Sequence, residues 1–245
     1  MRRVPVPASL TRRPTPDLAA CLRQAPVLAG LTEPSLQALA RAAHLRLFAR
    51  GQAVFQKDDP AEAIYVVHSG LVVIFLATAD GRELVINELQ PGDLFGEMAL
   101  LQRQPRSASA VARQASEVIQ MDGRVFLAVL ESEPRLMRQL LETLARRLRD
   151  SGEREGALAF LTAPARLARL LLDHAQAIAP SAAPDLACLV TTSQDDLAQR
   201  VGVTRQTVAK ILGGWRRAGW IITGRGKIML VNRAALKKVV LTAEL

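Results

Sequence analysis

The sequence contains few of the residues that form metal centres, disulfide frameworks or nucleophilic active sites. Its 245 residues include two cysteines and three histidines. Cys21 and Cys188 belong to no C-x-x-C motif, so their spacing supports neither an iron–sulfur cluster nor a structural zinc site nor a disulfide framework, and we expect two reduced thiols. No nucleophile motif and no complete phosphate-binding P-loop is present. We therefore expect no metal, no cofactor and no enzymatic activity.

Long hydrophobic runs are also missing. The most apolar stretch, Ala63 to Ala79, is interrupted at His68-Ser69-Gly70 and is rich in β-branched residues, so it predicts two strands and a turn rather than a membrane span. Residues 1–16 contain four arginines and four prolines with no apolar segment behind them, and they predict a basic flexible tail rather than a secretion signal. We expect a cytoplasmic protein that has no membrane partner.

Positive charge is distributed unevenly along the chain. The formal net charge is +9, and a hydrophobic share of 49% excludes wholesale disorder. Residues 191–245 contain ten basic and three acidic residues, whereas residues 17–190 are slightly acidic. A local basic excess is typical of a segment that binds a polyanion, although a solvated basic face would carry the same charge.

The segment between about residues 53 and 121 has the pattern of a small β-domain. Turn signals at Ser69-Gly70, Asp80-Gly81 and Pro91-Gly92-Asp93 separate short apolar runs, and Asp-Gly between two such runs is a strong hairpin signal. The predicted strands are Ala53–Phe55, Ile64–His68, Leu71–Leu76, Glu83–Leu89, Ser107–Ala112 and Val118–Met121. Many short antiparallel strands indicate a sandwich or a jelly-roll barrel.

Helices are predicted on both sides of these strands. Two precede them, over Asp17–Ala25 and Glu33–Ala43, the second with Thr32 as its N-cap. A long helix follows, from Pro134 to about Leu161, opened by Ser132.

The long helix has a heptad seam that favours pairing with a second copy of the chain, although a helix packed only on the barrel is the alternative. The seam residues are Met137, Leu141, Leu144, Leu148, Ser151, Glu155 and Leu158. A further helix over Arg166–Ala179 and a linker at Pro180–Pro184 complete this region.

The pattern after Thr191 predicts a winged helix-turn-helix. Ser193 caps a first helix that ends at Val201, Gly202 makes the turn, and Thr204 caps a second helix. The buried face of the second helix is predicted to carry Val208, Ile211, Leu212 and Trp215. A two-stranded wing is predicted from Trp220–Thr223 and Lys227–Val231 around a Gly224-Arg225-Gly226 turn.

The exposed first turn of the second helix has the side chains that read bases in a major groove. Arginine pairs with guanine and glutamine with adenine, so Arg205, Gln206 and Lys210 are candidate base contacts. The hydroxyls of Ser193, Thr204 and Thr207 suit backbone phosphates. A helical hairpin that contacts another protein is the alternative.

The most specific stretch runs from Phe95-Gly96-Glu97-Met98-Ala99 to Arg106-Ser107-Ala108. A glycine-led short helix after a strand offers backbone N–H groups to an anion, and Arg106 with Ser107 can clamp the same anion. Glu97 would repel a phosphate unless it faces a hydroxyl such as a ribose 2′-OH. Phosphate and ribose together indicate a nucleotide, whereas an ion pair between Glu97 and Arg106 on a surface loop is the alternative.

These motifs resemble the Crp–Fnr family of bacterial transcription regulators over about residues 22–240. The stretch from Gly96-Glu97 to Arg106-Ser107-Ala108 resembles the phosphate-binding cassette of cyclic-nucleotide domains, and residues 145–148 with 156–161 resemble the dimer helix of the family. Residues 201–208 resemble its DNA-reading turn. The resemblance implies an α+β fold: after the tail, a jelly-roll β-barrel that binds a cyclic nucleotide (17–133), a long dimerisation helix and hinge (134–162) and a C-terminal winged helix-turn-helix (163–245).

The resemblance also implies roles for individual residues. The implied ligand-binding set is Gly96, Glu97, Met98, Ala99, Arg106, Ser107, Ala108, Arg147, Ser151 and Gly152. Gly96 and Glu97 would hold the ribose, Arg106 and Ser107 would hold the cyclic phosphate, and Arg147 would support Glu97. Ser151 and Gly152 stand where the family has a pair of adenine-contacting hydroxyls, one of which Gly152 lacks.

The resemblance implies a homodimer that responds to cyclic AMP, binds a two-fold symmetric operator in double-stranded DNA and contacts RNA polymerase. Gln206 stands where the family often has glutamate, which predicts an altered base preference. The same fold could respond instead to cyclic GMP, to a cyclic dinucleotide or to no ligand. A regulatory subunit of an enzyme, with Arg12-Arg13-Pro14-Thr15 as a pseudosubstrate, is the remote alternative.

Overall fold

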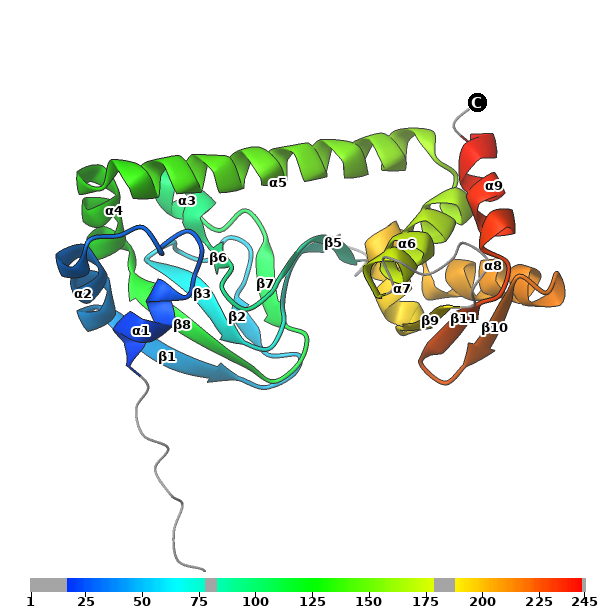
Figure 1. Cartoon of the computed structure of the whole chain (residues 1–245), viewed down its shortest axis with the longest axis horizontal. Helices are drawn as coiled ribbons and strands as arrows, with labels where there is room; N and C mark the ends of the chain where they lie inside the picture. The colour runs from blue at the N-terminus through cyan, green and yellow to red at the C-terminus, as the bar shows by residue number, and fades with distance from the viewer. Residues whose placement is uncertain (1–16, 78–82, 179–187, 244–245) are drawn as a thin grey trace, which may run out of the picture.

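The computed structural model describes residues 17–77, 83–178 and 188–243. The predicted basic tail, the Asp80-Gly81 turn and the Pro180–Pro184 linker lie outside the described residues. Figure 1 shows a β-rich N-terminal part and a smaller C-terminal part, with one long helix, α5 (Pro134–Phe160), running along the first toward the second. The predicted α+β architecture is confirmed, and α5, with 27 residues, is about 40 Å long.

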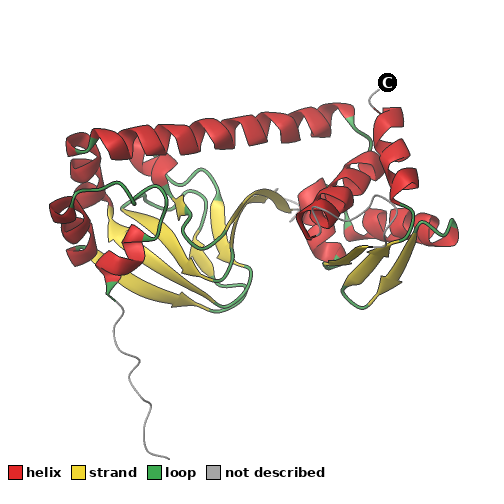
Figure 2. Ribbon diagram, viewed as in Figure 1, coloured by secondary structure: helices red, strands yellow, loops and turns green. Residues whose placement is uncertain are grey.

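Two four-stranded antiparallel sheets form the N-terminal barrel, as Figure 2 shows in yellow. One sheet has the order β1-β8-β3-β6 and the other β2-β7-β4-β5. The strands are β1 (Ala43–Phe48), β2 (Ala53–Phe55), β3 (Ala63–Ser69), β4 (Val72–Ala77), β5 (Glu83–Leu89), β6 (Leu94–Phe95), β7 (Ser109–Ala112) and β8 (Ser116–Asp122).

The barrel has two apolar cores because its strands alternate side chains between faces. Val67, Phe95 and Val118 pack between the two sheets, whereas Ile119 and Met121 pack under the helices at one end. Those helices are α1 (Leu18–Arg23), α2 (Glu33–Arg41), α4 (Gly123–Ser132) and the start of α5. A short helix, α3 (Glu97–Gln102), lies between the barrel and α5.

The C-terminal part is a helix-turn-helix domain with a small sheet. Its elements are α6 (Ala163–Ile178), β9 (Cys188–Thr191), α7 (Gln194–Val201), α8 (Arg205–Arg217), β10 (Ile221–Gly224), β11 (Lys227–Leu230) and α9 (Arg233–Ala243). The predicted caps are confirmed: the Ser193 hydroxyl accepts from the N–H of Asp196, and the Thr204 hydroxyl accepts from the N–H of Thr207. The wing is three-stranded rather than two-stranded, because β9 pairs with β11.

Both predicted helix starts, at Glu33 and Pro134, are confirmed, and Thr32 is the N-cap of α2, but buried Glu133 changes the hydrogen bonds expected at both starts. Thr32 stands at the cap of α2, but its hydroxyl donates to the Glu133 carboxylate instead of accepting from the helix backbone. Ser132 does not open α5, because Glu133 holds that position and the Ser132 hydroxyl donates to the carbonyl of Val129. A buried carboxylate needs donors, and the hydrogen bonds from Ser35 and Thr32 hold the pKa of Glu133 below its usual value.

Two further differences concern element type. Ala43, predicted as the end of a helix, begins β1, which pairs with β8 along its whole length. The elements β1, α4, β9 and α9 have no counterpart among the predicted elements, and β6 was implied only as the strand before the short helix of the motif. Within the described ranges, no helix is long and apolar enough to cross a bilayer.

Candidate functional site

A cavity of about 580 Å³ lies between the barrel and α5. Its lining includes nine of the ten predicted ligand residues: Gly96, Glu97, Met98, Ala99, Arg106, Ser107, Ala108, Arg147 and Ser151. Gly152 does not line it. The fold therefore brings the two halves of the sequence motif together with the long helix, in the volume range of small-molecule sites.

Gly96 turns the chain from β6 into α3. Its φ of +81° is a left-handed conformation that favours glycine. A Cβ at this position would lie 2.9 Å from Nη1 of Arg106 and 3.2 Å from the ring of Tyr65. A larger residue would therefore strain the backbone and displace the arginine that the motif places opposite.

Arg106 is a buried cation that holds the two ends of the motif together. Its Nη1 donates to the carbonyl of Gly96 at 2.7 Å and its Nη2 donates to the carbonyl of Ala63 at 2.6 Å. The guanidinium lies 4.4 Å from the ring centroid of Phe55 and 5.5 Å from that of Tyr65. Burial lowers the pKa of Arg106 and raises the pKa of Tyr65 from their usual values.

Part of the Arg106 guanidinium has no partner. Its Nε is buried and makes no hydrogen bond, and among the described residues no carboxylate forms an ion pair with this side chain. A buried donor without a partner costs about 1–3 kcal/mol, and more when it is charged. Arg106 also lines the cavity, so its positive charge can act on an anion bound there.

Glu97 is paired with the long helix and not with Arg106. Arg147 of α5 donates from Nη1 to Glu97 at 2.7 Å and from Nη2 to the carbonyl of Leu94 at 2.6 Å. Glu97 and Arg106 are each 2% exposed. The alternative of an ordinary Glu97–Arg106 ion pair on a surface loop is therefore wrong.

One face of α5 closes the cavity. Leu144, Arg147, Leu148, Ser151 and Arg154 follow helical spacing along this face. Arg154 was not predicted, although its position three residues after Ser151 could have indicated it. The apolar wall comes from strands and was also missed: Phe55, Ile74, Leu76, Ile86 and Leu89.

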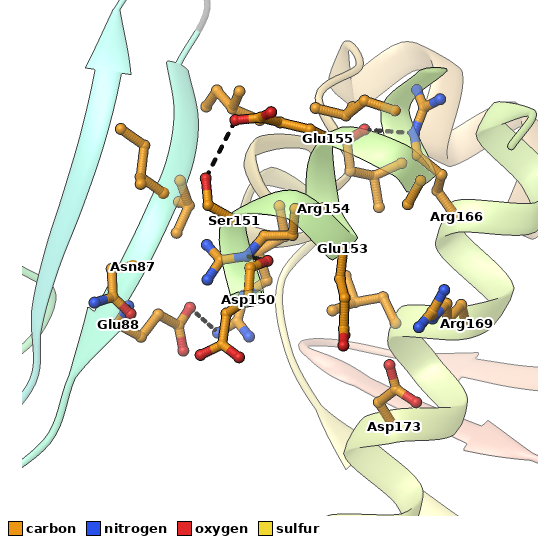
Figure 3. A pocket seen from close by; sticks show the side chains of 18 of the residues that line it. Asn87, Glu88, Asp150, Ser151, Glu153, Arg154, Glu155, Arg166, Arg169 and Asp173 are labelled. Carbon is orange, nitrogen blue, oxygen red and sulfur yellow. Dashed lines mark hydrogen bonds and ion pairs between the residues drawn. The ribbon is translucent and has the colours of Figure 1, made fainter. Parts of the chain in front are cut away.

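A second cavity of about 570 Å³ lies where the barrel, α5 and the C-terminal domain meet (Figure 3). Ser151 and Arg154 line both cavities. The Ser151 hydroxyl donates to Glu155 at 3.3 Å, as the dashed line in Figure 3 marks. Arg166 donates to the carbonyls of Leu161 and Val201, which ties α6 to both α5 and α7. The polar residues in the predicted seam therefore lie at the junction of the domains.

The predicted seam divides between an outer face and the interior. Met137 and Leu141 are exposed large apolar side chains, and Leu141 is 59% exposed; Leu148 is exposed too, although it also lines the ligand cavity. Leu144 instead packs against the helix core of the barrel. Leu158 turns toward the C-terminal domain, where its Cδ2 would lie 3.3 Å from a Cβ at Gly202.

The exposed side of α8 carries the predicted DNA contacts. Arg205, Gln206 and Lys210 are all exposed. Arg205 lies 3.7 Å from Asp195 in a solvent-exposed pair, which contributes little stability. The hydroxyl of Thr207 hydrogen-bonds that of Thr204, and the Ser193 hydroxyl donates to the Asp196 carboxylate at 2.7 Å. All three hydroxyls that were predicted to meet phosphates therefore already have hydrogen-bond partners: those of Ser193 and Thr204 cap helices, and that of Thr207 pairs with Thr204.

Metal chemistry has no support in the part of the chain that the structure describes. No group of three or more histidine, cysteine, aspartate or glutamate side chains lies close enough there to hold a metal ion. His174 is occupied as an acceptor, since its Nε2 lies 2.9 Å from Nη1 of Arg200.

Family models match both parts of the chain. Residues 45–133 match the cyclic nucleotide-binding domain, and residues 165–239 match the Crp-like helix-turn-helix domain. The CRP-like cAMP-activated global transcriptional regulator of Mycobacterium tuberculosis is 32% identical over 86% of this chain and 94% of its own length. The cyclic AMP receptor protein of Thermus thermophilus is 31% identical over 89% and 98%.

Solved structures show the same fold. A transcriptional regulator of the CRP family from Thermus thermophilus has a TM-score of 0.64 at 28% identity, and covers 80% of this chain and 96% of its own. The c-di-GMP responsive global regulator CLP of Xanthomonas campestris has a TM-score of 0.72 at 24% identity, with coverage of 81% and 99%. The second likeness carries no information beyond the fold.

Proposed function

Since the chain belongs to the Crp–Fnr family of transcription regulators, we propose that it is a homodimeric regulator whose sequence-specific DNA binding responds to cyclic AMP. It is a DNA-binding regulator with a cyclic nucleotide-binding domain, and not an enzyme. The effector, the residues that hold it and the dimer are the proposed parts. The proposal also includes a cytoplasmic location, a contact with RNA polymerase and the domain limits 17–133, 134–162 and 163–245.

The observation that carries the effector proposal is buried Arg106, which lines the cavity and forms no ion pair with a carboxylate among the described residues. A cyclic phosphate in the cavity would accept hydrogen bonds from the Arg106 guanidinium and from Ser107. Glu97, held by Arg147, would accept a hydrogen bond from the ribose 2′-hydroxyl. The ionised phosphate has no proton to donate to this carboxylate. The base would then extend along α5 toward Ser151, about 6 Å further along the helix axis than Arg147.

Cyclic AMP is favoured over other nucleotides by the relatives. Two relatives that are 31% and 32% identical to the chain are described as a cyclic AMP receptor and as cAMP-activated. Gly152, without a side chain and with open space around its Cα, offers no hydroxyl to the base, so the base would be held through Ser151 and its neighbours.

The DNA-binding proposal rests on α8 and on the exposed part of the helix seam. A homodimer joined along Met137, Leu141 and Leu148 would present two copies of α8 to successive major grooves, with half-sites about 34 Å apart. Arg205, Gln206 and Lys210 would then face base edges. Nucleotide binding can change DNA affinity only by favouring one arrangement of the domains, a coupling of typically about 1–3 kcal/mol.

Calorimetric titration of the purified protein with cyclic AMP, cyclic GMP and cyclic di-GMP tests the effector. DNA binding at a selected operator is then measured with and without each nucleotide. We expect tight binding of cyclic AMP and a rise in operator affinity. If only cyclic GMP or only cyclic di-GMP binds, that nucleotide is the effector and cyclic AMP is not. If none of the three binds, the proposal is overturned.

Sedimentation tests the dimer. Leu141 is exposed and lines neither cavity, so Leu141→Glu should produce monomers with weak operator binding and an intact barrel. The matched change of exposed Arg149 on the same helix, Arg149→Glu, should leave the dimer in place. A monomeric wild type would contradict this part of the proposal.

A further inference from the structure

Helix α7, the first helix of the helix-turn-helix, lies against strand β5 of the barrel (Figure 1). Three residues of α7 make polar contacts with three residues of the barrel. Gln199 donates to Glu83 at 2.7 Å, and Arg200 forms an ion pair with Glu88 at 2.7 Å. These four residues, together with Arg113 and Asp196 described next, are here named the clasp.

Arg113, in the turn between β7 and β8, supplies the third contact. It forms an ion pair with Asp196 at 2.7 Å and donates to the side chain of Gln199. Asp196 is itself fixed by the capping hydroxyl of Ser193. The clasp therefore contacts α7 from strand β5 and from the turn between β7 and β8. It binds the helix near its first turn as well as near its end.

The clasp is more than a loose surface contact. The side chains of Arg113, Asp196, Arg200 and Glu88 are between 24% and 29% exposed. Arg200 also donates to His174 of α6, so the ion pair is anchored in the C-terminal domain. A Cβ at Gly202 would lie within 3.4 Å of Leu84 and Leu158, so the chains approach closely beside the polar contacts.

Strand β5 belongs to both the ligand cavity and the clasp. Ile86, Asn87 and Leu89 line the cavity, whereas Glu83 and Glu88 hold α7. Asn87 and Glu88 are neighbours in the chain, and Figure 3 shows both beside the second cavity. A displacement of β5 caused by a ligand would therefore strain or release the contacts with the DNA-binding domain.

We propose that the clasp is the coupling device between the nucleotide cavity and the recognition helix: the contacts of β5 and Arg113 with α7 stabilise one orientation of the DNA-binding domain, and nucleotide binding acts on that orientation through β5. This inference rests on the proposed function. The clasp favours the arrangement in which its contacts form, so breaking it shifts the population away from that arrangement whether or not nucleotide is bound. The response of DNA affinity to nucleotide must then change, in the direction set by which arrangement binds DNA more tightly.

Charge exchange between Glu88 and Arg200 tests the coupling, because neither residue lines the nucleotide cavity. The variants are Glu88→Arg, Arg200→Glu and the two combined, with Glu131→Arg at an exposed position of α4 as the charge-matched control. The first measurement is the ratio of operator affinities with and without saturating cyclic AMP. Each single variant should change this ratio about three- to tenfold, both in the same direction, and the combined variant should restore most of the wild-type ratio.

The second measurement needs no nucleotide. Amide hydrogen exchange of α7 and β5 should rise in each single variant of the full-length dimer and return toward wild type in the exchanged pair. The control should change neither measurement.

The coupling is overturned if the single variants respond to nucleotide as the control does, or if the exchanged pair differs from wild type as much as the singles do. A wild type that binds no cyclic nucleotide would overturn the proposed function instead, and the coupling with it. A wild type that responds, with variants that respond equally, would overturn the coupling alone.

Discussion

Replacing Arg106 with methionine tests the proposed phosphate contact. Methionine keeps an unbranched apolar chain between Phe55 and Tyr65 but removes the charge and every N–H donor. The change deletes hydrogen bonds to the carbonyls of Gly96 and Ala63, each worth about 1.5–3 kcal/mol. Removing a buried cation relieves a desolvation cost of several kcal/mol. The free energy of unfolding should therefore fall by no more than about 3 kcal/mol.

The loss of nucleotide affinity should be larger than the loss of stability. Leaving a desolvated charge without its partner costs roughly 2–5 kcal/mol, so the Kd for cyclic AMP should rise at least about 30-fold. Calorimetric titration measures the Kd, and thermal unfolding of the same sample establishes that the variant is folded. Arg103→Met makes the same change at an exposed arginine at the end of α3 and should alter the Kd less than twofold. A folded Arg106→Met variant with wild-type affinity would refute the role of Arg106.

Three further predictions concern the motif, the domain junction and the DNA helix. Gly96→Ala should lose more stability and more nucleotide affinity than Gly51→Ala, because both have a left-handed φ (+81° and +82°) but only Gly96 has neighbours that a Cβ would strike; equal losses in titration and unfolding would contradict this. Burial and then Arg200 hold the pKa of His174 below 6.5, so the folded state binds fewer protons there than the unfolded chain. Its contribution to stability is complete above about pH 6.5 and is lost as the pH falls, so thermal unfolding from pH 8 to pH 5 should show a steeper acid loss in wild type than in His174→Gln. Gln206→Glu should move the preferred base at one half-site position from adenine toward cytosine, because glutamate can only accept a hydrogen bond. Binding-site selection that yields the same preferred sequence for the wild type and the variant would count against a base contact by this residue.

Local signals in the sequence were sufficient for much of the fold. The caps at Ser193 and Thr204 need only a hydroxyl three residues before a backbone N–H, and the structure has both. The predicted strand at Glu83–Leu89 has the observed bounds. Residues that meet their partners within a turn or a hairpin are therefore predictable from spacing alone.

Long-range partners were not predictable in the same way. The second carbonyl that Arg106 binds belongs to Ala63, 43 residues earlier. Glu133 takes its hydroxyl donors from Thr32 and Ser35, about a hundred residues away, so Thr32 is the N-cap of α2 without the side-chain hydrogen bond that its local sequence favours. A heptad pattern fixes the face of a helix but not which neighbour covers it, so Leu144 could not be distinguished from its exposed neighbours.

Arg106, Arg147 and Arg200 have different roles because their surroundings offer them different hydrogen-bond acceptors. Arg147 gives its donors to Glu97 and the carbonyl of Leu94, and Arg200 gives its donors to Glu88 and His174. Both are therefore structural in this arrangement, one fixing the carboxylate of the cavity and the other fixing α7. Arg106 alone of these three keeps a buried donor unused, although burial makes that vacancy costly. An anion in the cavity would meet the Arg106 guanidinium, which folding has already removed from water. The phosphate, rather than the base, should therefore contribute most of the nucleotide's binding free energy.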